Sequence, residues 1–183
     1  MLKIYKKSSV MIASMIFLIS FAAIGTAAFA VEPAHKASDL PEQIRLELIK
    51  VPNFGVFDNI AFNLEGTDTV VLTGQVISPV VKSGAEIALL RIPGIKKVVN
   101  NIEVLPLSRM DDEIRLKTYY AVYSNNGFEK YATMAQAPIR IIVDNGHVTL
   151  EGVVANKIDK SMAVLSANTV PGVFSVTDNL RIG

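Results

Sequence analysis

The side chains most often used for catalysis or metal binding are sparse in this sequence. Its 183 residues contain no cysteine and only two histidines, His35 and His147. Neither histidine has a second ligand at zinc-site spacing, and no phosphate loop, nucleophile elbow or paired-histidine motif is present. The run Asp111, Asp112 and Glu113 resembles a metal cluster, but consecutive acids at a helix start are more typical of dipole partners. We therefore predict a protein that is not an enzyme and uses no metal or cofactor.

Aromatic side chains near the middle of the chain are better candidates for binding a partner. Leu116, Tyr119, Tyr120 and Tyr123 recur at helical spacing, and tyrosine suits a boundary between apolar and aqueous phases. The alternative is that this stripe belongs to the core, because apolar residues at helical spacing usually mark burial. The predicted lipid- or partner-binding residues are Tyr119, Tyr120, Tyr123, Phe128, Lys130 and Tyr131.

These candidates lie in the second copy of a duplicated unit. The stretch VVLTGQV, residues 70–76, returns as VTLEGVV at residues 148–154, an offset of 78 residues. Upstream, IRL at residues 44–46 returns at residues 114–116, an offset of 70, so the second copy carries eight extra residues before its strands. Self-similarity at a fixed spacing over many positions indicates a repeated module.

Each copy has the pattern of a helix, two strands, a helix and a third strand. Leu40 begins the first helix, with Asp39 and Glu42 spaced like a capping box. Asp144-Asn145-Gly146 in the second copy is a strong hairpin signal. In the first copy the strands are expected at about 59–64, 70–76 and 96–104, with a helix at about 79–92. In the second copy a helix is expected from about 111, with strands at about 139–143, 148–154 and 174–182.

This pattern predicts an α+β fold of two tandem modules. Each module should contain a small mixed three-stranded sheet with both helices on one face and a right-handed crossover. A unit of about 70 residues is marginally stable alone, because it buries only about 60% of its unfolded surface. We expect the first module at residues 39–107 and the second at residues 108–183.

The repeated stretches resemble the BON domain, a module of bacterial osmotically inducible and nodulation-related proteins. The resemblance is carried by VVLTGQV, GAEIAL and IPGIKKVVNNIEV in the first copy, and by VTLEGVV and SMAVLSANTVPGVFSVTDNLRI in the second. It covers about Leu40 to Gly183, and two copies behind a signal peptide resemble the OsmY-like periplasmic proteins. The resemblance implies periplasmic residence, stress-related expression, and a role at phospholipid membranes or with envelope clients. It brings no catalytic motif.

Glycines and asparagines that repeat in the two copies form the fold signature of this resemblance. At Gly74 and Gly152 we expect close helix–sheet packing or a strand bulge rather than ligand contact. Asn101 and Asn179 are expected to satisfy backbone groups near the third strand. The full set is Gly74, Gly94, Asn101, Gly152, Gly172 and Asn179.

The N-terminus is typical of a secretory signal peptide. A basic start is followed by an apolar run at about residues 10–24 and an A-x-A end at Ala28 and Ala30. The alternative is an uncleaved anchor, although a spanning helix usually needs about 20 apolar residues. Residues 1–30 are thus the predicted signal peptide and residues 31–38 a linker, which places the mature protein in the periplasm.

Charge argues against one class of partner. Removal of the three lysines in the first 30 residues leaves 15 basic residues against 17 acidic ones, a net charge of −2. Such a surface gives no electrostatic basis for binding nucleic acid. Three hypotheses then stay open: association with a phospholipid membrane, chaperone-like binding of unfolded envelope proteins at an exposed sheet edge, or a structural domain that docks onto a partner protein. The sequence leaves the oligomeric state undetermined.

Overall fold

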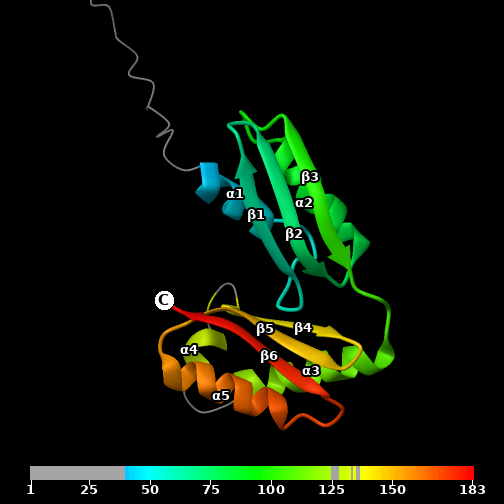
Figure 1. The fold of residues 1–183 in the computed structure, drawn as a ribbon, viewed down its shortest axis with the longest axis vertical. Helices are drawn as coiled ribbons and strands as arrows, with labels where there is room; N and C mark the ends of the chain where they lie inside the picture. Colours follow the sequence, from blue (N-terminus) through cyan, green and yellow to red (C-terminus); the bar gives the residue numbers. More distant parts are fainter. Residues whose placement is uncertain (1–39, 125–127, 133, 135–136) are drawn as a thin grey trace, which may run out of the picture. The chain divides into compact units, whose positions relative to one another are not determined.

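The structure is a computed structural model that describes residues 40–124, 128–132, 134 and 137–183 (Figure 1). The predicted signal peptide and the capping residue Asp39 lie outside the described residues. The first module contains α1 (Leu40–Ile49), β1 (Asn59–Glu65), β2 (Thr69–Val76), α2 (Pro79–Leu90) and β3 (Lys97–Val104). The second contains α3 (Arg109–Tyr123), α4 (Glu129–Ala132), β4 (Ile139–Asp144), β5 (His147–Val154), α5 (Lys157–Asn168) and β6 (Ser175–Ile182).

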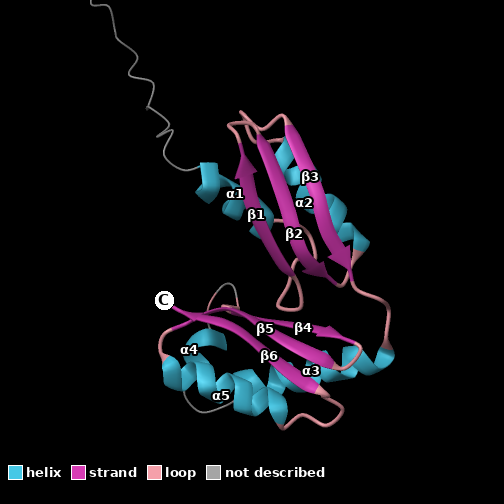
Figure 2. Ribbon diagram, viewed as in Figure 1, coloured by secondary structure: helices cyan, strands magenta, loops and turns pink. Residues whose placement is uncertain are grey.

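Both modules contain the same mixed sheet, which confirms the predicted fold class (Figure 2). The central strand pairs antiparallel with the strand before it and parallel with the strand after it. Leu72 lies opposite Phe62 and Asn100, and its counterpart Leu150 lies opposite Ile141 and Asp178. The 78-residue offset therefore relates equivalent positions of the two central strands.

A separate hydrophobic core holds each module together. In the first, alternate residues of β2 are buried against Val81, Ala85 and Leu89 of α2 and against α1. The second core joins β4, β5 and β6 to α3 and α5, which lie on one face of the sheet (Figure 2). Because full burial of one such side chain stabilises by about 1.5–3 kcal/mol, these two faces dominate stability. Within the described residues, no helix is long and apolar enough to cross a membrane.

Gly74 and Gly152 are required by a close approach of two strand backbones. Their φ angles are +117° and +127°, values that side-chain-bearing residues rarely adopt. A Cβ atom at Gly152 would lie 1.9 Å from the carbonyl oxygen of Pro138, and one at Gly74 would lie 2.1 Å from that of Asn59. The close neighbour is thus the backbone at the start of β1 or just before β4, and not a helix, which was the first of the two alternatives expected from the sequence.

The role predicted for Asn101 and Asn179 belongs to the residue before each of them. Asn100 accepts from the Ile102 amide at 3.3 Å and donates to the Lys82 carbonyl at 2.9 Å, which ties β3 to α2. At the equivalent position, Asp178 accepts from the Leu180 amide at 3.0 Å and pairs with Lys160 of α5 at 3.2 Å. The prediction was wrong by one position. The side chain of Asn179 donates to Glu151 instead.

Replacement of Gly152 tests the close contact between its backbone and that of Pro138. We expect Gly152→Ala to lower the free energy of unfolding by about 2–5 kcal/mol, because backbone strain adds to overpacking against Pro138. Gly94→Ala is the matched control, since Gly94 also has a positive φ but a Cβ atom added there would meet no other atom within 4 Å, and it should cost about 1–2 kcal/mol. Chemical unfolding of both variants gives the comparison, and equal losses would contradict the role of the close contact.

Candidate functional site

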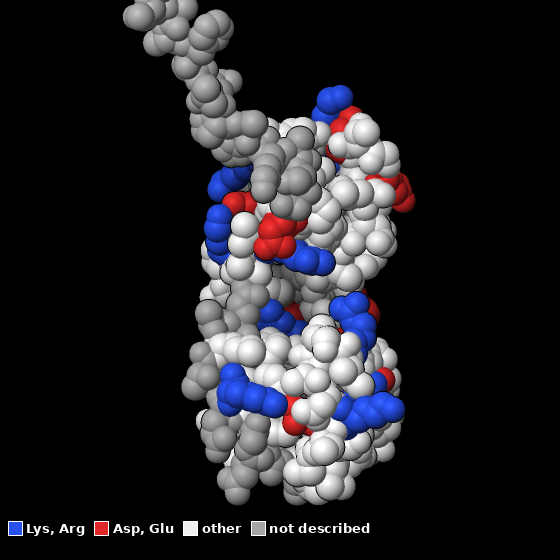
Figure 3. Space-filling view, turned by 90° about the vertical axis from the view of Figure 1, so that its left-hand side faces the viewer, with Lys and Arg blue, Asp and Glu red and all other residues white. Residues whose placement is uncertain are grey.

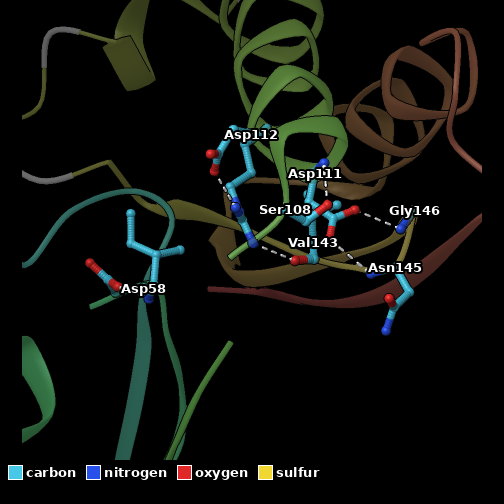
Figure 4. A network of polar contacts seen from close by, with 9 residues as sticks. Asp58, Ser108, Asp111, Asp112, Val143, Asn145 and Gly146 are labelled. Carbon is cyan, nitrogen blue, oxygen red and sulfur yellow. Dashed lines mark hydrogen bonds and ion pairs between the residues drawn. The ribbon is translucent and has the colours of Figure 1, made fainter. Parts of the chain in front are cut away.

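The acidic run at the start of α3 has a structural role. Asp111 is buried, and its carboxylate accepts from the amides of Gly146 at 2.8 Å and Asn145 at 3.1 Å (Figure 4). Ser108 caps the helix by accepting from the Asp111 amide at 3.2 Å. Asp111 thus fastens the β4–β5 turn to α3, an interaction that the dipole interpretation missed.

The other candidates for chemistry also have ordinary partners. Asp112 pairs with Arg115 at 2.6 Å, and Glu113 pairs with Lys117 at 3.2 Å. His147 is exposed and lies 2.8 Å from the Ser175 hydroxyl. In the described part of the chain, no group of three or more acidic, histidine or cysteine side chains is placed to hold a metal ion. His35 lies outside the described residues.

The free edge of β4 is closed by hydrogen bonds from other parts of the chain. The Tyr123 hydroxyl donates to the Ile139 carbonyl at 2.7 Å and accepts from the Ile139 amide at 3.1 Å. Farther along the edge, the Ile141 amide donates to the Val56 carbonyl at 2.9 Å. Arg115, which is buried, donates to the Val143 carbonyl at 2.7 Å. An edge strand covered in this way cannot accept a further strand without losing these bonds.

Val56 belongs to the loop between α1 and β1, which contacts the second module at several points. The Arg140 guanidinium donates to the Gly55 carbonyl at 2.7 Å and lies 4.8 Å from the centre of the Phe54 ring. Asp58 holds the loop in shape by accepting from the Gly55 and Ile77 amides. Burial raises the pKa of the Asp58 carboxyl, although these two hydrogen bonds oppose the shift.

An aromatic pocket of about 310 Å³ lies beside this contact. Helix α3, α4 and the α1–β1 loop all contribute to its wall. Its lining residues are Val56, Phe57, Leu116, Tyr119, Tyr120, Tyr123, Tyr131, Met134 and Ala137. The walls are therefore aromatic and aliphatic, with tyrosine hydroxyls as the polar side-chain groups.

The α3 aromatics form a graded series from core to surface. Tyr123 is buried, and desolvation raises the pKa of its phenol to about 12, so it stays neutral at ordinary pH. Tyr119 is half-buried, with its ring centre 5.0 Å from that of Tyr123 and 6.3 Å from that of Phe57. Tyr120 is 63% exposed, and its ring contacts Tyr119 at 5.6 Å. Of the four residues in this stripe, Leu116 and Tyr120 are thus the ones exposed enough to meet a partner.

The residues on and beside α4 anchor it to the rest of the module. Phe128 is 2% exposed and lies in the core. The buried Tyr131 donates to Asp159 at 2.5 Å and accepts from the Ala155 amide at 2.8 Å. Lys130 donates to the same carboxylate at 2.6 Å and lies 4.7 Å from the Tyr131 ring centre. These bonds lower the pKa of Asp159, with the Lys130 contribution the largest.

The structure therefore separates the six predicted binding residues. Tyr119, Tyr120, Tyr123 and Tyr131 line one pocket, whereas Phe128 is internal and the amine of Lys130 is held by Asp159. A binding role for any of them stays a prediction. Val56 and Phe57 were not among the predicted residues, because a short apolar stretch within a loop has no periodicity to mark it.

Charge around the surface is mixed. On the face drawn in Figure 3, basic and acidic side chains are interspersed with uncharged surface. Lys117 of α3 and Lys130 of α4, which lie on the two helices that supply the pocket's tyrosines, are paired with Glu113 and Asp159. We therefore expect the pocket to bind through apolar contact rather than through a strong electrostatic field.

Comparison with known proteins gives one family. The sequence profile of the BON domain matches residues 38–106 and 126–183. None of the curated proteins matches the chain. Two solved structures of CdsD, a structural protein of the type III secretion system of Chlamydia trachomatis, one of them its C-terminal domain, are each 13% identical with a TM-score of 0.28. They cover 79% of this chain, which in turn covers 98% and 93% of theirs. At this TM-score the likeness carries no functional information.

Tyr123→Phe tests the closure of the β4 edge. Loss of the hydroxyl leaves both backbone groups of Ile139 without their partner, so the free energy of unfolding should fall by about 1–3 kcal/mol. Ultraviolet titration should also lose the phenol that ionises near pH 12.

The same residue predicts a pH dependence. A raised phenol pKa contributes stability that is complete below about pH 10 and is lost as the pH rises toward 12. Between these values the wild type should lose stability more steeply than Tyr123→Phe. Identical slopes in alkaline unfolding would contradict the assignment.

Proposed function

The chain belongs to the BON domain family, and from this premise we propose a non-catalytic envelope protein that associates with phospholipid membranes through its second module. The observation that carries the proposal is the aromatic pocket with its exposed rim. Leu116, Tyr120 and Met134 are 51%, 63% and 52% exposed at its mouth. Exposed apolar side chains gathered at one opening are typical of an interaction site.

The chemistry of this rim suits a membrane surface. Tyrosine is enriched where hydrocarbon meets headgroups, since its ring is apolar and its hydroxyl can stay hydrated. Leu116 and Met134 line the same pocket as Tyr120 and supply flexible aliphatic surface, and full burial of one such side chain is worth about 1.5–3 kcal/mol. Shallow insertion of a few such groups gives weak, reversible binding.

Electrostatic attraction should add little. Lys117 and Lys130 already pair with carboxylates, so anionic lipid would have to compete for them. We therefore expect binding to be only partly sensitive to salt, because exposed charges are screened over about 10 Å at 0.1 M ionic strength.

The first module lacks the tyrosines of this rim. At the 70-residue offset, Tyr119, Tyr120 and Tyr123 correspond to Ile49, Lys50 and Asn53. Lys50 is exposed and pairs with Glu47 at 2.7 Å. This divergence supports a division of roles in which the second module meets the membrane. The predicted signal peptide supports a periplasmic location, and expression under osmotic stress follows from the family resemblance alone.

Sedimentation with liposomes tests the proposal. We expect Leu116→Ala combined with Tyr120→Ala to reduce the bound fraction of the mature protein severalfold on vesicles of mixed zwitterionic and anionic phospholipid. Both side chains are exposed, so the circular dichroism spectrum and unfolding midpoint should be unchanged.

A matched control comes from α5 of the same module. Ile158 and Leu165 are also exposed, at 73% and 60%, but neither lines the pocket. Ile158→Ala combined with Leu165→Ala should leave binding intact. Equal loss in both double variants, or no loss in the first, would refute the assignment of the site.

A further inference from the structure

The two modules treat the same edge strand differently. In the second module, the bonds made by Ile139, Ile141 and Val143 show which backbone groups of β4 point away from β5. These residues lie opposite Gly152, Leu150 and Val148. In the first module, the residues opposite the equivalent Gly74, Leu72 and Val70 are Ile60, Phe62 and Leu64 of β1. Their amides and carbonyls therefore point outward from the sheet in the same way.

Within the described part of the chain, the groups that close β4 have no counterpart at β1. Asn53 stands where Tyr123 would be, and it lies beyond the end of α1. Arg45, the counterpart of the buried Arg115, has a 69% exposed side chain that lies 3.6 Å from Glu42. From the residues that the structure describes, β1 receives no hydrogen bond other than those of its pairing with β2. Among the described residues, the outward donors and acceptors of β1 thus have no hydrogen-bond partner.

A cleft of about 570 Å³ runs along this edge. Its wall includes Leu48 of α1 and the β1 residues Ile60 and Phe62, which are partly buried against the first core. Arg45 and Arg181 also line it, and so does Glu151, whose carboxylate already accepts from Asn179 at 2.6 Å. The cleft therefore combines an apolar wall with two guanidinium groups beside the edge strand β1.

We propose that the outer edge of β1 is a binding site for an extended polypeptide segment, which adds to the sheet as a fourth strand. Another extended backbone is the ligand that presents amides and carbonyls at the spacing of a strand. The cleft favours apolar side chains at alternate positions of the partner, next to Leu48 and Phe62. A carboxylate on the partner would meet Arg45 or Arg181. This site is separate from the pocket proposed to meet lipid.

The test uses the mature chain and a short synthetic peptide that alternates valine with threonine and carries one glutamate near its end. The matched probe is the same peptide with alternate backbone nitrogens methylated, which keeps the side chains but removes donors on one edge. We expect the first peptide to bind and the methylated one to bind at least about tenfold more weakly. Amide shifts in nuclear magnetic resonance should concentrate at Ile60, Phe62 and Leu64.

Variants of the protein give an independent measurement. Leu64→Pro removes one outward amide from an edge strand, where proline is tolerated, and should weaken peptide binding about three- to tenfold. Leu64→Ala keeps the amide and should bind like the wild type. Arg45→Glu should weaken binding of the acidic peptide, whereas Arg91→Glu, at an arginine that does not line this cleft, should not.

Three outcomes would overturn the proposal. These are equally tight binding of the methylated peptide, amide shifts that map to another strand, and pairing of β1 with a second copy of the chain. The last is read from sedimentation velocity, in which Leu64→Pro would abolish a dimer. Liposome binding by the Leu116 and Tyr120 variants is measured separately, so failure of the peptide site leaves the membrane proposal standing.

Discussion

An edge strand must do something with the backbone groups that its sheet leaves unpaired, and this constraint organises much of the chain. Each module has only three strands, so two of every three are edges. At β4, a tyrosine hydroxyl, a loop carbonyl and a buried guanidinium take up the exposed groups. These three groups come from a long α3, which reaches the end of the strand, and from a loop of the first module. The closed edge thereby also fixes the wall of the aromatic pocket.

Duplication makes the contrast between the modules informative. Both copies keep the glycine that lets two strand backbones approach, and both keep a polar tie between the third strand and the second helix. They differ in the first helix, which has five more residues in the second copy and carries the tyrosines. The same repeated unit thus has a covered β4 edge with an aromatic rim in the second module, and an open β1 edge beside a cleft in the first.

The sequence predicted the fold well because its signals are local. Alternating residues, the Asn145-Gly146 turn and the Pro-Gly helix stops place nearly every strand and helix. The residue that bonds the third-strand backbone was predicted one position too late. Asn101 and Asn179 are the same residue type in both copies and therefore drew the prediction, whereas the bonds are made by Asn100 and Asp178, which differ in type. The pocket was only half predicted, because Val56 and Phe57 reach it through tertiary contacts. The four-residue α4 is too short to show a period.

The tight turn between β4 and β5 has a consequence for how the chain acquires its structure. Asn145 and Gly146 adopt φ angles of +50° and +79° in a two-residue connection, a geometry that both residue types accept readily. Local hairpins form within about 1–10 μs, whereas the parallel pairing of β5 with β6 must wait for the intervening helix. We expect the second hairpin to nucleate its module, with Asp111 then locking α3 onto an already folded turn. The first module connects its two strands by a longer turn, between Glu65 and Thr69, so we expect its hairpin to form less readily.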